Sequence, residues 1–134
     1  MSEENKALVQ RSWEMDSPED LDEFYPPDVV WHMPEEELRG IEEAKRFVSS
    51  FLGAFPDVSF SVEDLIAEGN KVVSRYTVRG THRGETEEFG PPTSRQLEQE
   101  GITIHLIEDG KIVEEWNQYD NLSILQQLGL APEQ

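Results

Sequence analysis

The stretch from Gly101 to Leu130, GITIHLIEDGKIVEEWNQYDNLSILQQLGL, predicts two β-strands joined by a tight turn and followed by a short helix. Asp109-Gly110 is a strong signal for a two-residue hairpin turn of type I′, because both central residues of that turn need positive φ. Pairing then runs outward from this turn. The expected partners are Glu108 with Lys111, Ile107 with Ile112, His105 with Glu114, Thr103 with Trp116, and Gly101 with Gln118.

The two faces of this hairpin follow from the alternation of side chains along a strand. One expected face is polar and aromatic and contains Thr103, His105, Ile107, Ile112, Glu114, Trp116, Gln118 and Asp120. The opposite face is mostly aliphatic and contains Ile102, Ile104, Leu106, Val113, Glu115, Asn117 and Tyr119. The first face predicts the wall of a pocket, and the second predicts burial against helices or another subunit.

The composition indicates one domain over residues 1–134, large enough for a core without disulfides or structural metals. The absence of cysteine excludes a disulfide framework, a thiol nucleophile and a cysteine-based zinc site. No apolar run approaches membrane-spanning length, and the acidic start MSEENK does not resemble a signal peptide. We therefore expect a cytoplasmic protein with no membrane association.

The net charge is strongly negative, with 29 acidic against 11 basic residues and a formal charge of −18. Such a surface repels phosphate backbones, so nucleic acid is not an expected partner. Two interpretations of the acidity are open. It is either an ordinary self-repelling, soluble surface or an adaptation to high salt, where screening relieves the repulsion.

The rest of the chain predicts an α+β protein in which helices pack on one face of a curved, mainly antiparallel sheet. About three N-terminal helices are expected, and the strongest runs from Ile41 to Phe55 with apolar residues at helical spacing. A second hairpin turn at Gly69-Asn70 places Asp64 opposite Arg75 as a cross-strand ion pair. The expected helices and strands are 2–15, a short helix after Ser17, strand 28–33, helix 41–55, and strands 58–67, 71–81 and 96–107.

Several segments resemble the SnoaL-like polyketide cyclases of the nuclear-transport-factor-two-like superfamily. They are DVVWHMP near residue 30, AFPDVSFSVEDLIAEGNKVVSRYTVRGTHRG from 54, FGPPTSR from 89, GITIHLIEDGKIVEEWNQYD from 101, and QQLGL near the end. The resemblance covers nearly the whole chain in order. It implies a cone-shaped fold with a short C-terminal helix and a deep pocket between helices and sheet. It also implies frequent homodimers, no metal and no organic cofactor.

The resemblance also implies site residues. Cyclases of this type close a ring by an intramolecular aldol reaction, with an aspartate of the final strand as general acid/base and a histidine on the neighbouring strand. Asp120 and His105 resemble these two residues. The assignment depends on register, because a slip of one residue would move the side chain to the other face and point to Tyr119 instead. Independently of the resemblance, Asp120 also suits a helix cap before Asn121 or Leu122.

The remaining site candidates are polar or aromatic side chains on predicted strands. His32 is a further catalytic candidate, placed to close the mouth of the pocket. Ligand-binding candidates are Trp116, Gln118, Thr103, Tyr76 and His82. A metal site built from the three histidines is an alternative that their spacing does not favour. Most other aromatic residues, Trp13 and Trp31 among them, are expected in the core.

We therefore expect a cyclase- or isomerase-type lyase that acts without a cofactor on a small, mostly apolar carbonyl compound. Asp120 would move a proton at carbon while His105 and His32 hydrogen-bond the carbonyl as it becomes an enolate. The alternatives are a non-catalytic binding module on the same fold, an isomerase or an epoxide hydrolase. The aliphatic face of the hairpin, with Ile102, Ile104, Leu106, Val113 and Tyr119, predicts a homodimer joined through it.

Overall fold

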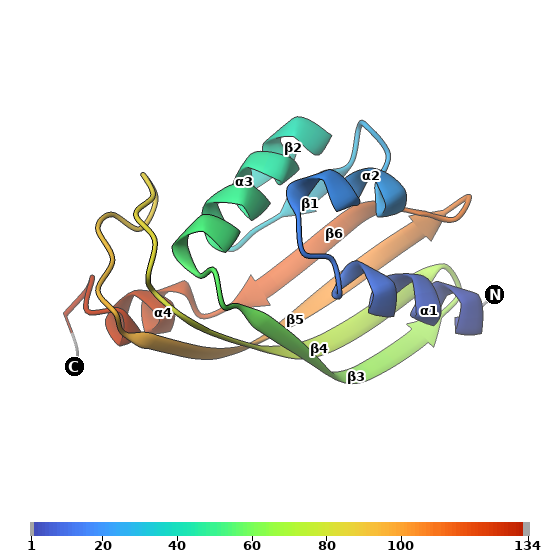
Figure 1. Ribbon diagram of the computed structural model, residues 1–134. Coiled ribbons are helices and arrows are strands. Elements are labelled where there is room, and N and C mark those ends of the chain that lie inside the picture. Colours follow the sequence, from blue (N-terminus) through green and yellow to red (C-terminus); the bar gives the residue numbers. More distant parts are fainter. Residues whose placement is uncertain (1, 133–134) are drawn as a thin grey trace.

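A computed structural model describes residues 2–132 of the chain, and Figure 1 shows its curved sheet with helices packed over one face. The helices are α1 (Ser2–Ser12), the 3-10 helix η1 (Pro18–Asp20), α2 (Leu21–Phe24), α3 (Ile41–Ala54) and α4 (Asn121–Gln127). The strands are β1 (Val30–His32), β2 (Glu37–Arg39), β3 (Ser59–Glu68), β4 (Lys71–Thr81), β5 (Gln96–Glu108) and β6 (Lys111–Tyr119). The predicted α+β class is confirmed.

The six strands form one sheet in the order β2-β1-β6-β5-β4-β3. The pair β1–β6 is parallel and the other pairs are antiparallel. Helices α1, α2 and α3 lie over the concave face, and α4 lies at the end of the sheet where β6 ends (Figure 1). The sheet and the three N-terminal helices therefore enclose the interior, while the convex outer face is left open.

The longest helix, α3, forms because its apolar residues recur at helical spacing and face the sheet. It begins after Gly40, whose φ of 89° suits a residue without a side chain. Its buried residues include Ile41, Ala44 and Ala54. Phe55 ends it just before Pro56, which cannot continue a helix.

Both predicted hairpin turns are present. Asp109 and Gly110 have φ of 51° and 75°, as a type I′ turn requires. In the hairpin of β3 and β4, which turns at Gly69-Asn70, Asp64 pairs with Arg75, and Arg75 Nε lies 2.7 Å from Asp64 Oδ2. The sequence did not predict β2, which begins at Glu37, the last residue of an acidic run expected to form a loop. It has three residues, with only Leu38 buried, so it is too short for a periodic pattern to be recognised.

The predicted register of the last hairpin is wrong beyond its first two pairs. Glu108 pairs with Lys111 and Ile107 with Ile112, but Leu106 then pairs with Glu114, because Val113 is an extra residue in β6. Such a β-bulge exchanges the two faces of one strand for every later residue. His105 consequently lies opposite Glu115, Thr103 opposite Asn117, and Gly101 opposite Tyr119.

Candidate active site

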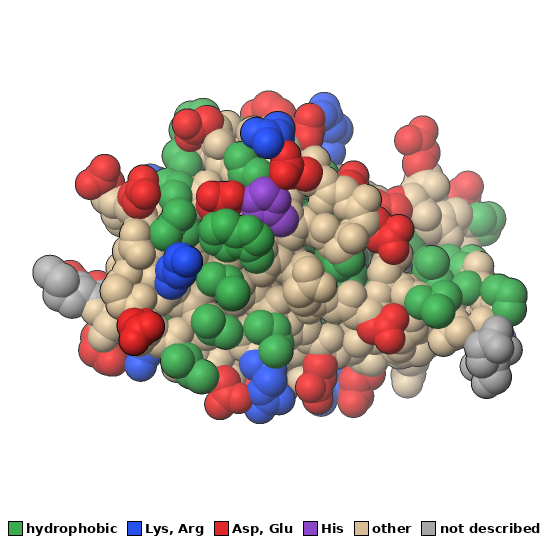
Figure 2. All heavy atoms as spheres, turned by 180° about the vertical axis from the view of Figure 1, so that it is seen from behind, with side chains coloured by type: hydrophobic (Ala, Val, Ile, Leu, Met, Phe, Trp, Pro, Cys, Tyr) green, Lys and Arg blue, Asp and Glu red, His purple; other side chains and the backbone are tan. Residues whose placement is uncertain are grey.

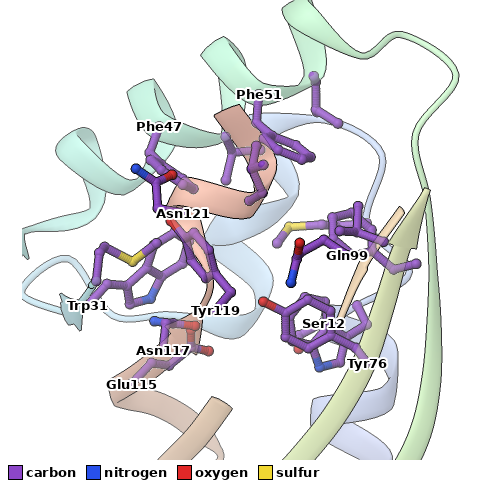
Figure 3. A pocket seen from close by; sticks show the side chains of 18 of the residues that line it. Ser12, Trp31, Phe47, Phe51, Tyr76, Gln99, Glu115, Asn117, Tyr119 and Asn121 are labelled. Atoms are coloured by element: carbon purple, nitrogen blue, oxygen red, sulfur yellow. The ribbon is translucent and has the colours of Figure 1, made fainter. Parts of the chain in front are cut away.

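An apolar cavity of about 150 Å³ lies between α3 and the concave face of the sheet. Figure 3 shows Phe47 and Phe51 of α3 on one side, with Trp31, Glu115 and Asn117 grouped on a second and Tyr76 and Gln99 opposite them. Other lining residues are Ser12, Trp13, Met15, Tyr25, Met33, Val48, Leu52, Phe60, Val78, Glu88, Phe89, Tyr119, Asn121 and Ile124. Among the described residues no lysine or arginine lines it, so the cavity suits an uncharged ligand.

Glu115 is the buried carboxylate of this cavity. It lies on the inner face of β6 and is 5% exposed. Its Oε2 accepts hydrogen bonds from Tyr25 Oη at 2.7 Å and from His105 Nδ1 at 2.8 Å. Its Oε1 has no hydrogen bond to any of the residues that the structure describes. One oxygen is thus held by two donors, and the other is left for a ligand.

A chain of hydrogen bonds behind Glu115 fixes the orientation of His105. Trp13 Nε1 donates to Ser74 Oγ at 3.1 Å, and Ser74 Oγ lies 2.8 Å from His105 Nε2. Because a carboxylate oxygen only accepts hydrogen bonds, Nδ1 donates to Glu115, and the contact between Nε2 and Ser74 Oγ holds the other side of the ring. His105 is 1% exposed and does not line the cavity. The predicted catalytic histidine therefore supports a carboxylate rather than contacting a ligand directly.

Two more inner-face residues of β6, Asn117 and Tyr119, also line the cavity. Thr103, a predicted ligand-binding residue, is fully buried and donates to Asn117 Oδ1 at 2.8 Å, so it positions an amide instead of lining the cavity. Burial, together with Glu88, Glu36 and Glu35, raises the pKa of Tyr119 to about 12. Tyr119 is therefore a neutral phenol, and the three glutamates near it form a negatively charged rim.

Tyr76, a predicted pocket residue, does line the cavity. Gly101 makes room for it, because a Cβ at that position would lie 2.3 Å from Tyr76 Oη. Burial, followed by the neighbouring Tyr119 and Glu115, raises the pKa of Tyr76, so it stays protonated. The Tyr76 hydroxyl points into the cavity from the wall opposite Glu115 (Figure 3).

Trp31 contributes an indole to the same wall as Glu115. The two residues are direct partners in the parallel pairing of β1 with β6, and the Tyr25 ring lies 5.2 Å from the Trp31 ring. Trp31 is 5% exposed, and its buried Nε1 has no hydrogen-bond partner among the described residues. Met33, two residues further along the chain, also lines the cavity.

Asp120 lies at the surface. It is exposed and caps α4, where its Oδ1 accepts a hydrogen bond from Ser123 N at 2.9 Å. The expectation that it shares a face with His105 is wrong, because the bulge at Val113 reverses the faces of β6. Asp120 therefore has the position of the helix cap that the sequence also allows.

The outer face of the sheet holds three other candidates. Trp116 and Gln118 lie there because of the same reversal, and His32 lies there because β1 alternates with Trp31 inward. The His32 ring stacks on Trp116 at 5.4 Å and contacts Glu114 and Glu37. None of these residues contacts the cavity, so the expected role of His32 at the mouth has no geometric support.

His82 is fully buried at the base of the loop 83–95, behind Phe89 of the cavity wall. Thr93 N donates to its Nδ1 at 3.3 Å, and its Nε2 has no hydrogen-bond partner among the described residues. Burial lowers the pKa of His82, and a smaller contribution from the Gly84 backbone opposes this shift. His82 holds the loop that supplies Phe89 rather than lining the cavity itself.

The three histidines hold separate positions, so they do not form the shared site considered from the sequence. Within residues 2–132, no group of three or more histidine, aspartate or glutamate side chains is arranged to hold a metal ion. In the same range, no helix is both long enough and apolar enough to cross a lipid bilayer.

Glu115, Asn117 and Trp31 were not predicted as site residues. The expected register, which has no bulge, puts the first two on the opposite face, and Trp31 is expected in the core. The available signal for Trp31 was the alternation in DVVWHM, where Val29, Trp31 and Met33 make one face wholly apolar.

The open cone with a cavity between three helices and a curved sheet is of the nuclear-transport-factor-two-like class. Solved structures with this fold include a protein from Jannaschia sp. CCS1 assigned as a SnoaL-like polyketide cyclase, with a TM-score of 0.87 and 22% identity over 98% of this chain and 95% of that one. AclR from Streptomyces galilaeus, assigned as a hydroxylase, has a TM-score of 0.84 and 28% identity over 98% and 100%. IdmH from Streptomyces antibioticus, assigned as a polyketide cyclase, has a TM-score of 0.75 and 29% identity over 96% and 99%.

Residues 6–128 match the family model of the SnoaL-like polyketide cyclases, and the chain belongs to this family. A comparison with functionally curated protein sequences gives no match.

Proposed function

We propose that this protein is a cofactor-independent acid/base enzyme of the cyclase type that acts on an uncharged, mostly apolar carbonyl compound, with Glu115 as its general base. The supporting observation is the arrangement of the Glu115 carboxylate. One oxygen is fixed by Tyr25 and His105, and the other has no hydrogen bond within the described chain. Membership of a family named for polyketide cyclases supports the same reaction class.

In this reaction Glu115 Oε1 accepts a proton from the carbon next to the ligand carbonyl. The resulting enolate then attacks a second carbonyl of the same molecule and closes a ring. A base that is held in place and shielded from water is efficient because little reorganisation accompanies the proton transfer. Tyr25 and His105 are positioning residues, because they fix the carboxylate without lying against the transferred proton.

The aldol reaction also needs a proton for the new alkoxide. The protonated Glu115 can return the proton that it removed, so the sequence of steps needs no external acid and no redox partner. This balance agrees with the absence of a cofactor expected from the family resemblance. The hydrophobic wall favours a flat, apolar substrate body that excludes water from the reacting atoms.

The rival proposal is a binding module without catalysis. It is favoured by the apolar lining, because most of the wall offers contact area and no chemistry. The two proposals differ in whether the Glu115 carboxylate moves a proton.

Proton exchange at carbon tests this difference without knowledge of the natural substrate. The probe is 2-tetralone, a bicyclic ketone whose protons beside the carbonyl exchange with D₂O and are followed by NMR. We expect the wild-type protein to accelerate this exchange, and Glu115→Gln to lower the acceleration at least about a hundredfold, because glutamine keeps the shape but is no base.

Glu114→Gln is the matched control, since it removes the adjacent carboxylate on the outer face and should leave exchange unchanged. Undiminished exchange in Glu115→Gln would remove Glu115 from the mechanism. Binding of the ketone by the wild-type protein without any acceleration would favour the binding module.

A further inference from the structure

The indole of Trp31 presents an unsatisfied hydrogen-bond donor in the wall of the apolar cavity. Its Nε1 is buried and has no partner among residues 2–132. A buried donor without an acceptor destabilises the folded protein, so such atoms are rare unless something else supplies the acceptor. Trp31 lines the cavity, and a ligand in that cavity is the available source.

The other two tryptophans provide a contrast. Trp13 also lines the cavity, but its Nε1 donates to Ser74 Oγ at 3.1 Å. Trp116 lies on the outer face, stacked on His32. Trp31 is therefore the tryptophan whose ring faces the cavity while its N–H has no acceptor in the described protein.

The position of Trp31 relative to Glu115 defines the chemistry that this donor serves. The two residues are paired across β1 and β6, and Tyr25 contacts both, through its ring with Trp31 and through its hydroxyl with Glu115. The residue whose donor lacks an acceptor is thus the strand partner of the residue whose second carboxylate oxygen lacks a donor. An enolisable carbonyl matches this pair, because its oxygen accepts a hydrogen bond and its neighbouring C–H gives up a proton.

We infer that Trp31 Nε1 donates a hydrogen bond to the ligand's carbonyl oxygen and holds the adjacent carbon at Glu115. The inference rests on the proposed function for the role of Glu115, but recognition of the carbonyl stands on Trp31 alone. An indole N–H donates and cannot accept, so it selects an acceptor oxygen. The negative rim and the lack of a lysine or arginine in the described lining make that ligand an uncharged ketone rather than an acid.

The hydrogen bond also strengthens as the reaction proceeds. Removal of the proton transfers negative charge to the carbonyl oxygen, and a donor in a water-poor site stabilises that charge more than it stabilises the neutral ketone. Because Nε1 is buried, this hydrogen bond requires the lining side chains to move slightly so that the carbonyl oxygen can reach it. Trp31 is thus assigned as the oxyanion donor of the cavity.

The test compares 2-tetralone with tetralin, its hydrocarbon counterpart, in the protein labelled with ¹⁵N at its three tryptophans. The three indole N–H signals are assigned from the single Trp→Phe variants. We expect 2-tetralone to move the Trp31 proton signal downfield, as a new hydrogen bond does, and tetralin to leave it nearly in place. The Trp13 and Trp116 signals should respond alike to both compounds.

Binding of the same two compounds to Trp31→Phe provides the second readout. We expect the dissociation constant of the ketone to rise about two- to tenfold, as for the loss of one neutral hydrogen bond. That of tetralin should change less than twofold, and Trp116→Phe should change neither. Equal Trp31 shifts with both compounds, or no Trp31 shift up to the solubility limit of the ketone, would overturn the inference even if Trp31→Phe does not fold.

This outcome is distinguishable from that of the proposed function. Unchanged proton exchange in Glu115→Gln would remove the base but leave the Trp31 shift intact. A missing Trp31 shift with exchange that still depends on Glu115 would leave the base and remove the oxyanion donor.

Discussion

Each face of β6 carries a glutamate that contacts a histidine of a neighbouring strand, but the two pairs have different surroundings. On the outer face, His32 contacts Glu114, and the two side chains are 31% and 32% exposed. On the inner face, His105 contacts Glu115, and their side chains alone are 1% and 6% exposed. Water and salt screen the outer pair. The inner pair lies in a water-poor interior, where hydrogen bonds are electrostatically stronger and the loss of one is more costly. A histidine–carboxylate contact alone therefore does not identify a reactive site.

The largest expected difference between the two faces is in stability. His105→Leu leaves the buried Glu115 without one of its two donors, and we expect a loss of about 3 to 5 kcal/mol in the free energy of unfolding. His32→Leu should cost no more than about 1 kcal/mol, because its partners remain partly hydrated. Urea unfolding of both variants gives the comparison.

A double variant sharpens this test. His105→Leu with Glu115→Met removes the stranded carboxylate and should recover most of the lost stability, since a packed apolar pair avoids the desolvation cost. Similar losses in His105→Leu and His32→Leu would show that burial does not distinguish the two pairs.

The outer face is also the expected dimer interface. Ile66, Ile102 and Ile104 are exposed there, and Figure 2 shows apolar side chains on the rear face bordered by acidic and basic ones. Of the apolar strip predicted from the sequence, Tyr119 belongs to the cavity instead. We expect Ile102→Lys with Ile104→Lys to halve the mass measured by light scattering, because two buried charges would oppose association.

The control for this prediction is Leu122→Lys, which changes an exposed apolar residue in α4 and should not alter the mass. A wild-type protein that is monomeric at micromolar concentration would contradict the dimer.

The third histidine tests whether burial alone gives a pH response. Burial lowers the pKa of His82 in the folded protein, so the folded state binds fewer protons than the unfolded chain. The stabilising contribution is therefore complete above the ordinary histidine pKa of about 6.5 and is lost as the pH falls below it. Arg83, Arg95 and Asp57 make no hydrogen bond to the His82 ring in the described structure.

His82→Gln removes the titrating ring while keeping a polar side chain. We expect its unfolding free energy to fall less than that of the wild-type protein between pH 7 and pH 5, as measured by urea unfolding at each pH. The 29 acidic residues titrate in both proteins, so the difference between them isolates His82. Parallel pH profiles would contradict the role of His82.

The smallest effect is expected at Asp120, the surface carboxylate. Asp120→Asn keeps the cap of α4, because asparagine caps a helix about as well as aspartate. We expect a change below about 0.5 kcal/mol in unfolding free energy and no change in the exchange of 2-tetralone protons. A large loss of exchange in this variant would return Asp120 to the mechanism that the family resemblance implies.

Local signals were sufficient to predict much of the fold. The turn residues Asp109-Gly110 and Gly69-Asn70 marked both hairpins, and helical spacing marked α3 within one residue. The Asp64–Arg75 ion pair followed from a turn and a count along two strands. These features depend on residues close in sequence or on pairings that start at a tight turn.

The site could be predicted only in part, because the inward face of β6 depends on the bulge at Val113. The segment IVEEWNQY allows either face of the strand to point inward, since each face mixes apolar and polar side chains. The choice is made by contacts from distant segments, such as Tyr25 with Glu115 and the pairing of β1 with β6. No local pattern carries that information.

The bulge at Val113 has a consequence for protein engineering and for comparing members of the family. An alignment that places no gap there would equate outward residues of one protein with inward residues of another for the remainder of β6. Substitutions transferred from a homologue without the bulge would then arrive on the wrong side of the sheet. Conversely, deleting one residue here would exchange the lining and the surface in a single step, so insertions and deletions at this position can diversify the cavity faster than point mutations.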